Sequence, residues 1–136
     1  MQRRQGFTLL ELLIVVVILG VLALIAAPSL LNAADQAKDA TVKANESAAA
    51  SSVTSRFALN NNNDSASEIA TAVADELNGE NKNPVDATAA AFATGGTAPG
   101  SVVLTADDAT DTIVITGYGK QGDLLVTKTV KAPASN

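Results

Sequence analysis

The 136-residue chain contains no cysteine and no histidine, and only four of its residues are aromatic. Without cysteine there can be no disulfide, no thiolate metal ligand and no cysteine nucleophile. Without histidine, a triad with an imidazole base and the usual zinc sites are excluded as well. No pair of carboxylates lies in an apolar sequence context that would tune it for acid–base catalysis. These absences remove the commonest nucleophile, base and metal ligands, and we expect no catalytic residue, no metal and no other cofactor.

Positive charge is also scarce. Nine basic residues stand against 14 acidic ones, which gives a net charge of −5. Two of the basic residues, Arg3 and Arg4, precede Gly6, and without them the count is 7 against 14, or −7. An acidic chain with few aromatic residues lacks the basic surface that nucleic acids require. We do not expect nucleic acid as a partner. A DNA-binding module is the alternative, and the negative charge disfavours it.

Large apolar residues are concentrated in one segment near the N-terminus. In residues 9–27, 17 of 19 are apolar, whereas in residues 28–136 only 45 of 109 are, and 23 of those 45 are alanine. A 19-residue helix is about 28 Å long, which matches the hydrocarbon core of a bilayer. The two arginines precede this segment and the next basic residue is Lys38. This asymmetry favours an N-terminus in the cytoplasm and a C-terminal body on the other side.

Two general explanations of the apolar segment remain open at this point. One is a secretory signal peptide cleaved after the Val-Leu-Ala of residues 21–23, and the other is a plain single-span anchor. Glu11 fits neither well, because an unpaired charge in a membrane span costs on the order of 1–3 kcal/mol. The apolar run also continues past Ala23 without a polar region before a cleavage site.

The residues around this charge resemble a known signal. A short basic leader ends at Gly6 and is followed by an apolar run that opens with Phe7, Thr8, Leu9, Leu10 and Glu11. From about residue 5 to residue 28 this pattern resembles the class III signal of type IV pilins and pseudopilins. The resemblance implies that a membrane prepilin peptidase removes residues 1–6 by cutting after Gly6, and that the new N-terminus, Phe7, is methylated. The apolar helix is then retained in the mature protein.

The resemblance also implies roles for two residues beside the cleavage point. Glu11 lies one helical turn after Phe7, and in the family such a carboxylate is thought to meet the N-terminal amine of a neighbouring subunit. Thr8 adds a hydroxyl beside that pair. The alternatives are that Glu11 extends to the lipid headgroups and that Thr8 bonds its own helix backbone.

The apolar segment predicts polymerisation. It holds 14 valine, leucine or isoleucine residues, and keeping them from water is worth roughly 20–40 kcal/mol gross. The net stability of a protein this size is only about 5–15 kcal/mol, so lipid or other copies of the same helix must cover that surface. A head-to-tail contact that does not close produces a helical filament. We therefore expect a homo-oligomeric polymer.

Gly20 and Pro28 interrupt the pattern of this helix. Glycine lowers helix stability by about 1 kcal/mol, and an interior proline removes a backbone hydrogen bond. In related filaments such a stretch unwinds on assembly, so the resemblance implies flexibility between these two residues. A simple bend at Pro28 is the alternative.

The rest of the chain predicts an α+β domain. The first helix should continue to about residue 59, with Val42, Ala49, Val53 and Phe57 forming an inward stripe. Ser65 and Glu68 have the spacing of a capping box, which predicts a short helix over about 66–78. Runs rich in β-branched residues predict an antiparallel sheet of three to four strands within about 101–131, and residues 89–93 could form an additional short strand.

These elements divide the chain into a leader (1–6), a membrane and filament-core helix (7–28) and a head domain (29–136). The expected fold is type IV pilin-like: one long helix with a protruding apolar half, whose C-terminal half packs on the sheet. Many pilins hold the C-terminal segment with a disulfide, and this chain cannot.

Asp107, Asp108 and Asp111 cluster in one predicted turn without a calcium-ligand pattern.

The sequence thus favours a structural subunit of a type IV pilus, serving adhesion, twitching motility or surface interaction. The precursor is expected in the inner membrane with its C-terminus outside, and the assembled protein in an extracellular filament. Its expected partners are other copies of itself, the prepilin peptidase and the pilus assembly machinery. The alternative within the family is a minor pilin or a pseudopilin of a type II secretion or DNA-uptake system.

Overall fold

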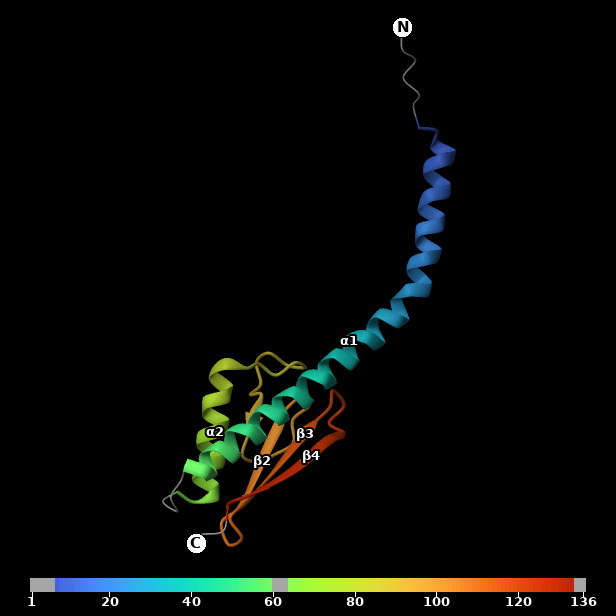
Figure 1. Cartoon of the computed structure of the whole chain (residues 1–136). Helices are drawn as coiled ribbons and strands as arrows, with labels where there is room; N and C mark the ends of the chain where they lie inside the picture. Colours follow the sequence, from blue (N-terminus) through green and yellow to red (C-terminus); the bar gives the residue numbers. More distant parts are fainter. Residues whose placement is uncertain (1–6, 60–63, 134–136) are drawn as a thin grey trace. The chain divides into compact units, whose positions relative to one another are not determined.

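The computed structural model describes residues 7–59 and 64–133 of the chain. The chain divides into two compact units, Met1–Asp35 and Gln36–Asn136. Its elements follow one another in this order: α1 (Leu9–Leu59), α2 (Ala66–Glu80), β1 (Phe92–Ala93), β2 (Val102–Asp107), β3 (Thr112–Tyr118) and β4 (Leu124–Lys131) (Figure 1).

In the first unit, the described part consists almost entirely of the beginning of α1, and this part has no buried side chain. The buried residues of α1 begin at Val42, in the second unit. The helix of the first unit is therefore rich in leucine, valine and isoleucine, but these residues form no core there. Their helix is stable as an isolated element only where something other than water covers it.

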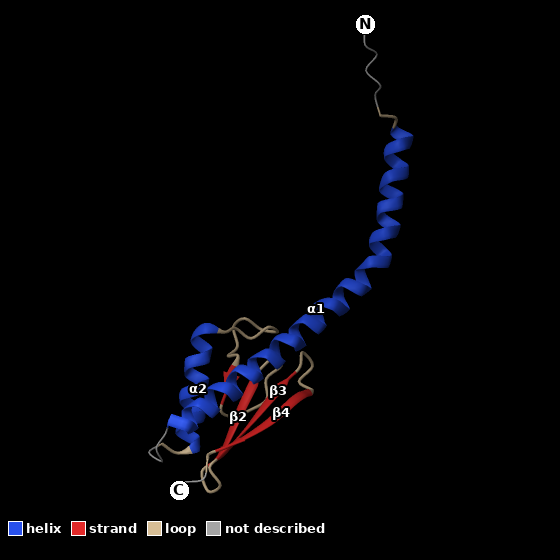
Figure 2. Cartoon of the chain, in the orientation of Figure 1, coloured by secondary structure: helices blue, strands red, loops and turns tan. Residues whose placement is uncertain are grey.

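The sheet of the second unit has the strand order β1-β2-β3-β4. Strands β2, β3 and β4 form an antiparallel meander, because the connections between them are short (Figure 2). The short β1 pairs with β2 in parallel, with Phe92 opposite Val102. A register shift interrupts the pairing of β3 with β4 between Gly117 and Tyr118.

One face of the sheet carries the core of the second unit. Residues 36–59 of α1 and the whole of α2 lie on this face (Figure 2). The predicted inward stripe of α1 is confirmed, since its four residues are at most 6% exposed. Phe92 from β1 is also buried in this core. The strands contribute Val102, Leu104, Ile113, Ile115 and Val130.

Helix α2 begins with the predicted capping box. The Ser65 side chain accepts a hydrogen bond from the Glu68 N–H, and the Glu68 carboxylate accepts one from the Ser65 N–H over 2.9 Å. The helix ends at Glu80, two residues beyond the expected end. Asp108 supports the same helix terminus, because its two carboxylate oxygens accept hydrogen bonds from the N–H and the hydroxyl of Ser67, over 2.7 and 2.8 Å.

Asparagine side chains hold the long connection between α2 and β2. Asn83 is 3% exposed, and its amide donates to the carbonyl oxygens of Ala90 and Pro99. Its Oδ1 accepts from the N–H groups of residues 85 and 86. Asn78 exchanges two hydrogen bonds with the backbone of Phe92. These amides fix a segment that has no disulfide to hold it.

The expected fold class is confirmed: a long helix with an apolar N-terminal half precedes a sheet that packs on its C-terminal half. The expectation of three to four antiparallel strands differs in one respect, because β1 is parallel to β2. Its two residues are held in that direction by the Asn78 contact with Phe92 and by the Val102 N–H, which donates to the carbonyl of Ala91. The parallel pairing of β1 with β2 thus depends on contacts between residues distant in sequence.

Candidate assembly site

Thr8 and Glu11 form a reciprocal hydrogen-bonded pair at the N-terminus of α1. The backbone N–H and the hydroxyl of Thr8 both donate to Oε2 of Glu11, each over 2.8 Å. In return, the Glu11 N–H donates to the Thr8 hydroxyl over 3.2 Å. This arrangement is a capping box, which satisfies backbone donors that the first helical turn leaves without a partner. The two residues therefore start the helix within a single chain.

The capping box has a plain signal in the sequence, a threonine followed three residues later by a glutamate, directly ahead of an apolar run. The family resemblance assigns Glu11 to a contact between subunits and misses its capping role within the chain. The hydroxyl of Thr8 accepts a hydrogen bond from the backbone of its own helix, which was the alternative role expected for this residue. The second carboxylate oxygen of Glu11, Oε1, accepts no hydrogen bond from the described residues, so it is available to another group.

The apolar segment that follows is exposed along its whole length. Its large side chains are 44–83% exposed, and none of its residues is buried. By length and composition, this is the one described helix that could cross a membrane. An apolar surface of this extent on a small protein marks contact with a membrane or with other proteins.

The residues assigned to processing lie just before this helix. Phe7 is 76% exposed and precedes the first residue of α1. Gly6 and the leader lie outside the described residues. The cut after Gly6 and the methylation of Phe7 thus remain predictions.

Gly20 and Pro28 both lie inside α1, which is helical on either side of them. A side chain built at Gly20 would meet nothing within 4 Å, so no contact with the described residues requires a glycine there. Pro28 has no N–H to donate to the carbonyl of Leu24, one turn before it, and this leaves a weak point in the hydrogen-bond ladder. The described helix therefore does not unwind between the two residues, and their role in flexibility on assembly remains a prediction.

The acidic cluster of the β2–β3 turn serves the fold. Asp107 accepts hydrogen bonds from the Ala109 N–H and the Thr110 hydroxyl, and these bonds, the hydroxyl's above all, lower the pKa of Asp107. Asp108 supports the start of α2, as described above. Within residues 7–59 and 64–133, no group of three acidic side chains is placed to hold a metal ion.

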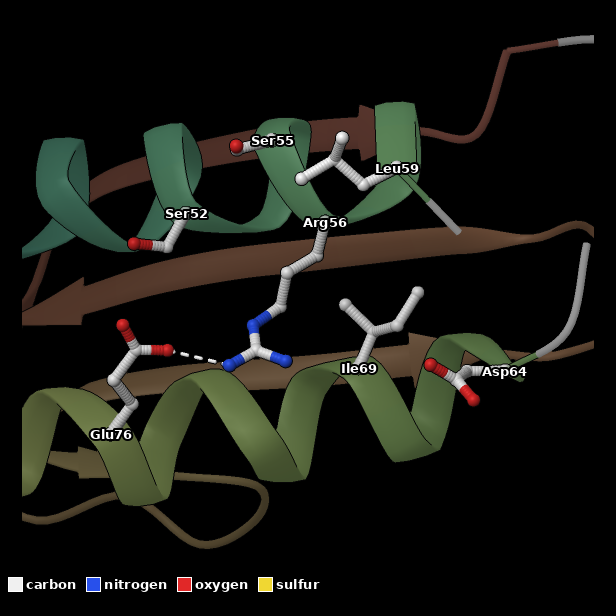
Figure 3. A pocket seen from close by; sticks show the side chains of 7 residues that line it. All are labelled: Ser52, Ser55, Arg56, Leu59, Asp64, Ile69 and Glu76. Atoms are coloured by element: carbon white, nitrogen blue, oxygen red, sulfur yellow. Dashed lines mark hydrogen bonds and ion pairs between the residues drawn. The ribbon is translucent and has the colours of Figure 1, made fainter. Parts of the chain in front are cut away.

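An open hollow of about 390 Å³ lies between the C-terminal end of α1 and α2 (Figure 3). Across it, the Arg56 guanidinium donates to the Glu76 carboxylate over 2.6 Å. Both side chains are about half exposed, so this ion pair contributes only about 0–1 kcal/mol. The remaining lining residues are Ser52, Ser55, Leu59, Asp64 and Ile69.

Comparisons with known proteins match the N-terminal part of the chain. Residues 1–27 match the family model of the prokaryotic N-terminal methylation motif. The type II secretion system core protein G of Pseudomonas aeruginosa is 53% identical over 45 residues, which is 32% of each chain. The type IV narrow pilus major component of Thermus thermophilus is 50% identical over 46 residues, which is 34% of this chain and 40% of that protein. The match thus spans about a third of the length of these relatives, and no solved structure matches the chain.

The α+β fold is pilin-like, and its long helix opens with a prepilin-type apolar N-terminus. The methylation motif and the two relatives show that this N-terminus is similar to those of a type IV pilus component and a type II secretion core protein. The relatives come from two systems, since one is named for a pilus and the other for a secretion system. The resemblance drawn from the first 28 residues is confirmed at this level.

Proposed function

We propose that the chain is the structural subunit of a type IV pilus. The precursor spans the inner membrane once, with the C-terminus outside. The prepilin peptidase cuts it after Gly6 and methylates Phe7, and the pilus assembly machinery polymerises it through residues 7–28 into an extracellular filament. The observation that carries this proposal is the apolar segment of α1, which has no buried residue in the chain itself. Filament contacts between like helices cover such a surface once it leaves the lipid.

Glu11 would fix the position of each subunit along the filament. One of its oxygens is used by Thr8 within the chain, and the other can accept the amine of Phe7 from a neighbouring subunit. Taken out of water, an unlike charge pair removes the cost that each charge has alone. Flexibility between Gly20 and Pro28 would let the helices adjust to one another as the filament forms.

A glutamine at position 11 tests this role more sharply than an alanine does. Glutamine keeps a side-chain oxygen that can complete the capping box with Thr8, but it has no charge. We expect Glu11→Gln to insert into the membrane normally and to form few or no surface filaments. Thr8→Val is the matched control, because it removes the hydroxyl of the capping box and leaves the charge of Glu11. Normal filament yield from Glu11→Gln would contradict the proposed charge pair.

Mass spectrometry of sheared surface filaments tests the function itself. The expected result is a fibre made mostly of this chain, beginning at a methylated Phe7. A bulky residue in place of Gly6 should leave an uncleaved precursor in the membrane. A mature chain that begins after Ala23 would show an ordinary secretory signal and end the proposal.

A second candidate is a pseudopilin of a type II secretion system. It is favoured by the 53% identity to the core protein G of such a system over 45 residues. Deleting the gene distinguishes the two candidates: a pilus subunit leaves the cells without surface fibres, whereas a pseudopilin leaves them unable to secrete their substrates. Adhesion and motility would be scored on the same strain.

A further inference from the structure

Helix α2 carries charge of one sign only. All its charged residues are acidic, and one of them, Glu76, is paired with Arg56. Glu68 and Asp75 are exposed and have no ion-pair partner among the described residues. They are seven residues apart, which places them on one face of the helix about 10.5 Å from each other along its axis.

A shallow hollow of about 410 Å³ lies between these two carboxylates. Its lining residues are Ser67, Glu68, Thr71, Ala72 and Asp75. Small side chains at positions 67, 71 and 72 leave the hollow open, while the two acidic residues stand at its ends. The hydrogen bonds from Ser65, the backbone one first, lower the pKa of Glu68, which keeps this carboxylate charged near neutral pH.

The opposite edge of the sheet carries the complementary charge. Strand β4 is the last strand of the sheet, and among the described residues it pairs only with β3. Its two charged residues, Lys128 and Lys131, are exposed and have no ion-pair partner in the described part of the chain. Three residues of extended strand separate the two positions by about 10 Å, close to the axial spacing of positions 68 and 75 on α2. They lie on opposite faces of the strand, and their long flexible stems allow both ammonium groups to reach the open edge.

The acidic hollow and the basic edge cannot meet within one chain. Helix α2 contacts β1, β2 and β3, whereas β4 is the far edge of the same sheet. Matching charges at opposite ends of one domain favour a head-to-tail contact between identical copies, and such a contact repeats without closing.

We propose that Lys128 and Lys131 of one copy of this chain bind in the hollow of a second copy, between its Glu68 and Asp75. This inference rests on the proposed filament and adds the contact between head domains. Exposed ion pairs contribute little stability each. The contact therefore sets the orientation and register of neighbouring heads, while the apolar helices hold the filament together.

The absence of native cysteine allows a direct test with Asp75→Cys and Lys128→Cys in the full-length chain. Filaments of the double variant are treated with a short bismaleimide and separated on a denaturing gel. A head-to-tail contact links every subunit to the next and gives a ladder of multimers. An equal mixture of the two single variants should give dimers and no longer products.

Two results would overturn the proposal. One is the absence of a ladder in filaments whose two cysteines both react with a monofunctional maleimide. The other is dimer formation by Lys128→Cys alone, which would indicate a symmetric contact between two β4 edges. Failure of the wild-type chain to form filaments, or normal filaments from Glu11→Gln, would instead count against the proposed function or its charge pair.

Charge reversal gives an independent measurement. The pair Lys128→Glu and Lys131→Glu should reduce filament yield several-fold, and the matched pair Lys43→Glu and Lys82→Glu, with the same change in net charge, should not. Adding Asp75→Lys to the first pair should restore part of the yield. Equal losses from both pairs, or no recovery with Asp75→Lys, would show that net charge alone matters and would contradict the contact.

Discussion

At the scale of single residues, one buried side chain, that of Asn83, holds the connection between α2 and β2. Its side chain donates two hydrogen bonds and accepts two, and all four go to backbone groups of the connection between α2 and β2. Neither an apolar residue nor a carboxylate can serve as both donor and acceptor in this way. The segment therefore depends on the chemistry of one buried amide.

Asn83→Asp should destabilise the fold by about 2–4 kcal/mol, because aspartate cannot donate to the two carbonyl oxygens and brings a charge into a buried site. Urea unfolding of the full chain in detergent micelles, followed by circular dichroism, measures this loss. Asn81→Ala is the control, since the Asn81 side chain is half-buried and donates one bond, to Leu77, and should cost about 1 kcal/mol. Equal losses from the two variants would contradict the special role of Asn83.

Three surface carboxylates give the fold a dependence on pH. Hydrogen bonds from the Ser65 backbone to Glu68, from the Thr88 side chain to Asp86 and from the Thr110 side chain to Asp107 lower the pKa of each acid. Because each pKa is lower in the folded chain than in the unfolded one, these bonds stabilise fully above the unfolded values, at about pH 4, and the stabilisation is lost as pH falls through the folded ones.

The midpoint of thermal unfolding should therefore be flat between about pH 7 and 5 and fall below about pH 4. Glu68→Gln keeps an oxygen for the capping box but cannot titrate, so its midpoint should fall less over the same acid range. An identical fall in the variant and the wild type would show that Glu68 does not contribute.

At the scale of elements, two glycines with opposite surroundings test how α1 packs on the sheet. A methyl group added to Gly117 in β3 would lie 2.9 Å from side-chain carbons of both Val42 and Val126. The same group on Gly79 in α2 would meet nothing within 4 Å. The first position needs glycine for the close approach of helix and strand, and the second does not.

Gly117→Ala should destabilise the fold by about 1–3 kcal/mol through overpacking. Gly79→Ala should stabilise it by about 0.5–1 kcal/mol, because alanine favours the helix and meets no obstacle. Denaturant unfolding of both variants under one set of conditions gives the comparison. A loss in Gly79→Ala as large as that in Gly117→Ala would mean that the packing described for α1 on β3 is not the cause.

The sequence predicts those elements whose local pattern and tertiary environment agree. Apolar content specifies the start of α1, the Ser65–Glu68 spacing specifies the start of α2, and β-branched runs specify the antiparallel strands. Contacts distant in sequence are not predictable in this way: the Asp108 bonds to Ser67 span 41 residues, and the parallel β1 depends on Asn78. For the assembly site, the residue types of Thr8 and Glu11 indicate both the capping box and the family, whereas the hollow on α2 emerges only once its exposed face is known.

At the scale of the whole molecule, the chain separates the residues that fold it from those proposed to assemble it. Every member of the buried core cluster lies at or after Val42. The large side chains of residues 9–25 are all exposed in the described structure. The 23 alanines and 22 larger apolar residues of positions 28–136 are thus sufficient for a core of two helices on one sheet, and the apolar N-terminal segment is not part of it.

A chain that begins at Ser29 should therefore fold and remain soluble without detergent. We expect a monomer by light scattering, with a cooperative thermal transition close to that of the full chain in micelles, because the deletion removes no core residue. The full chain should require detergent or lipid, since the 14 large aliphatic residues of positions 9–27 expose several hundred Å² of apolar surface, more than soluble monomers tolerate. Aggregation or a non-cooperative transition of the truncated chain would show that residues 1–28 contribute to the fold of the head domain. A folded monomer would show that the segment serves contacts outside the fold of its own chain, with a membrane or with other copies.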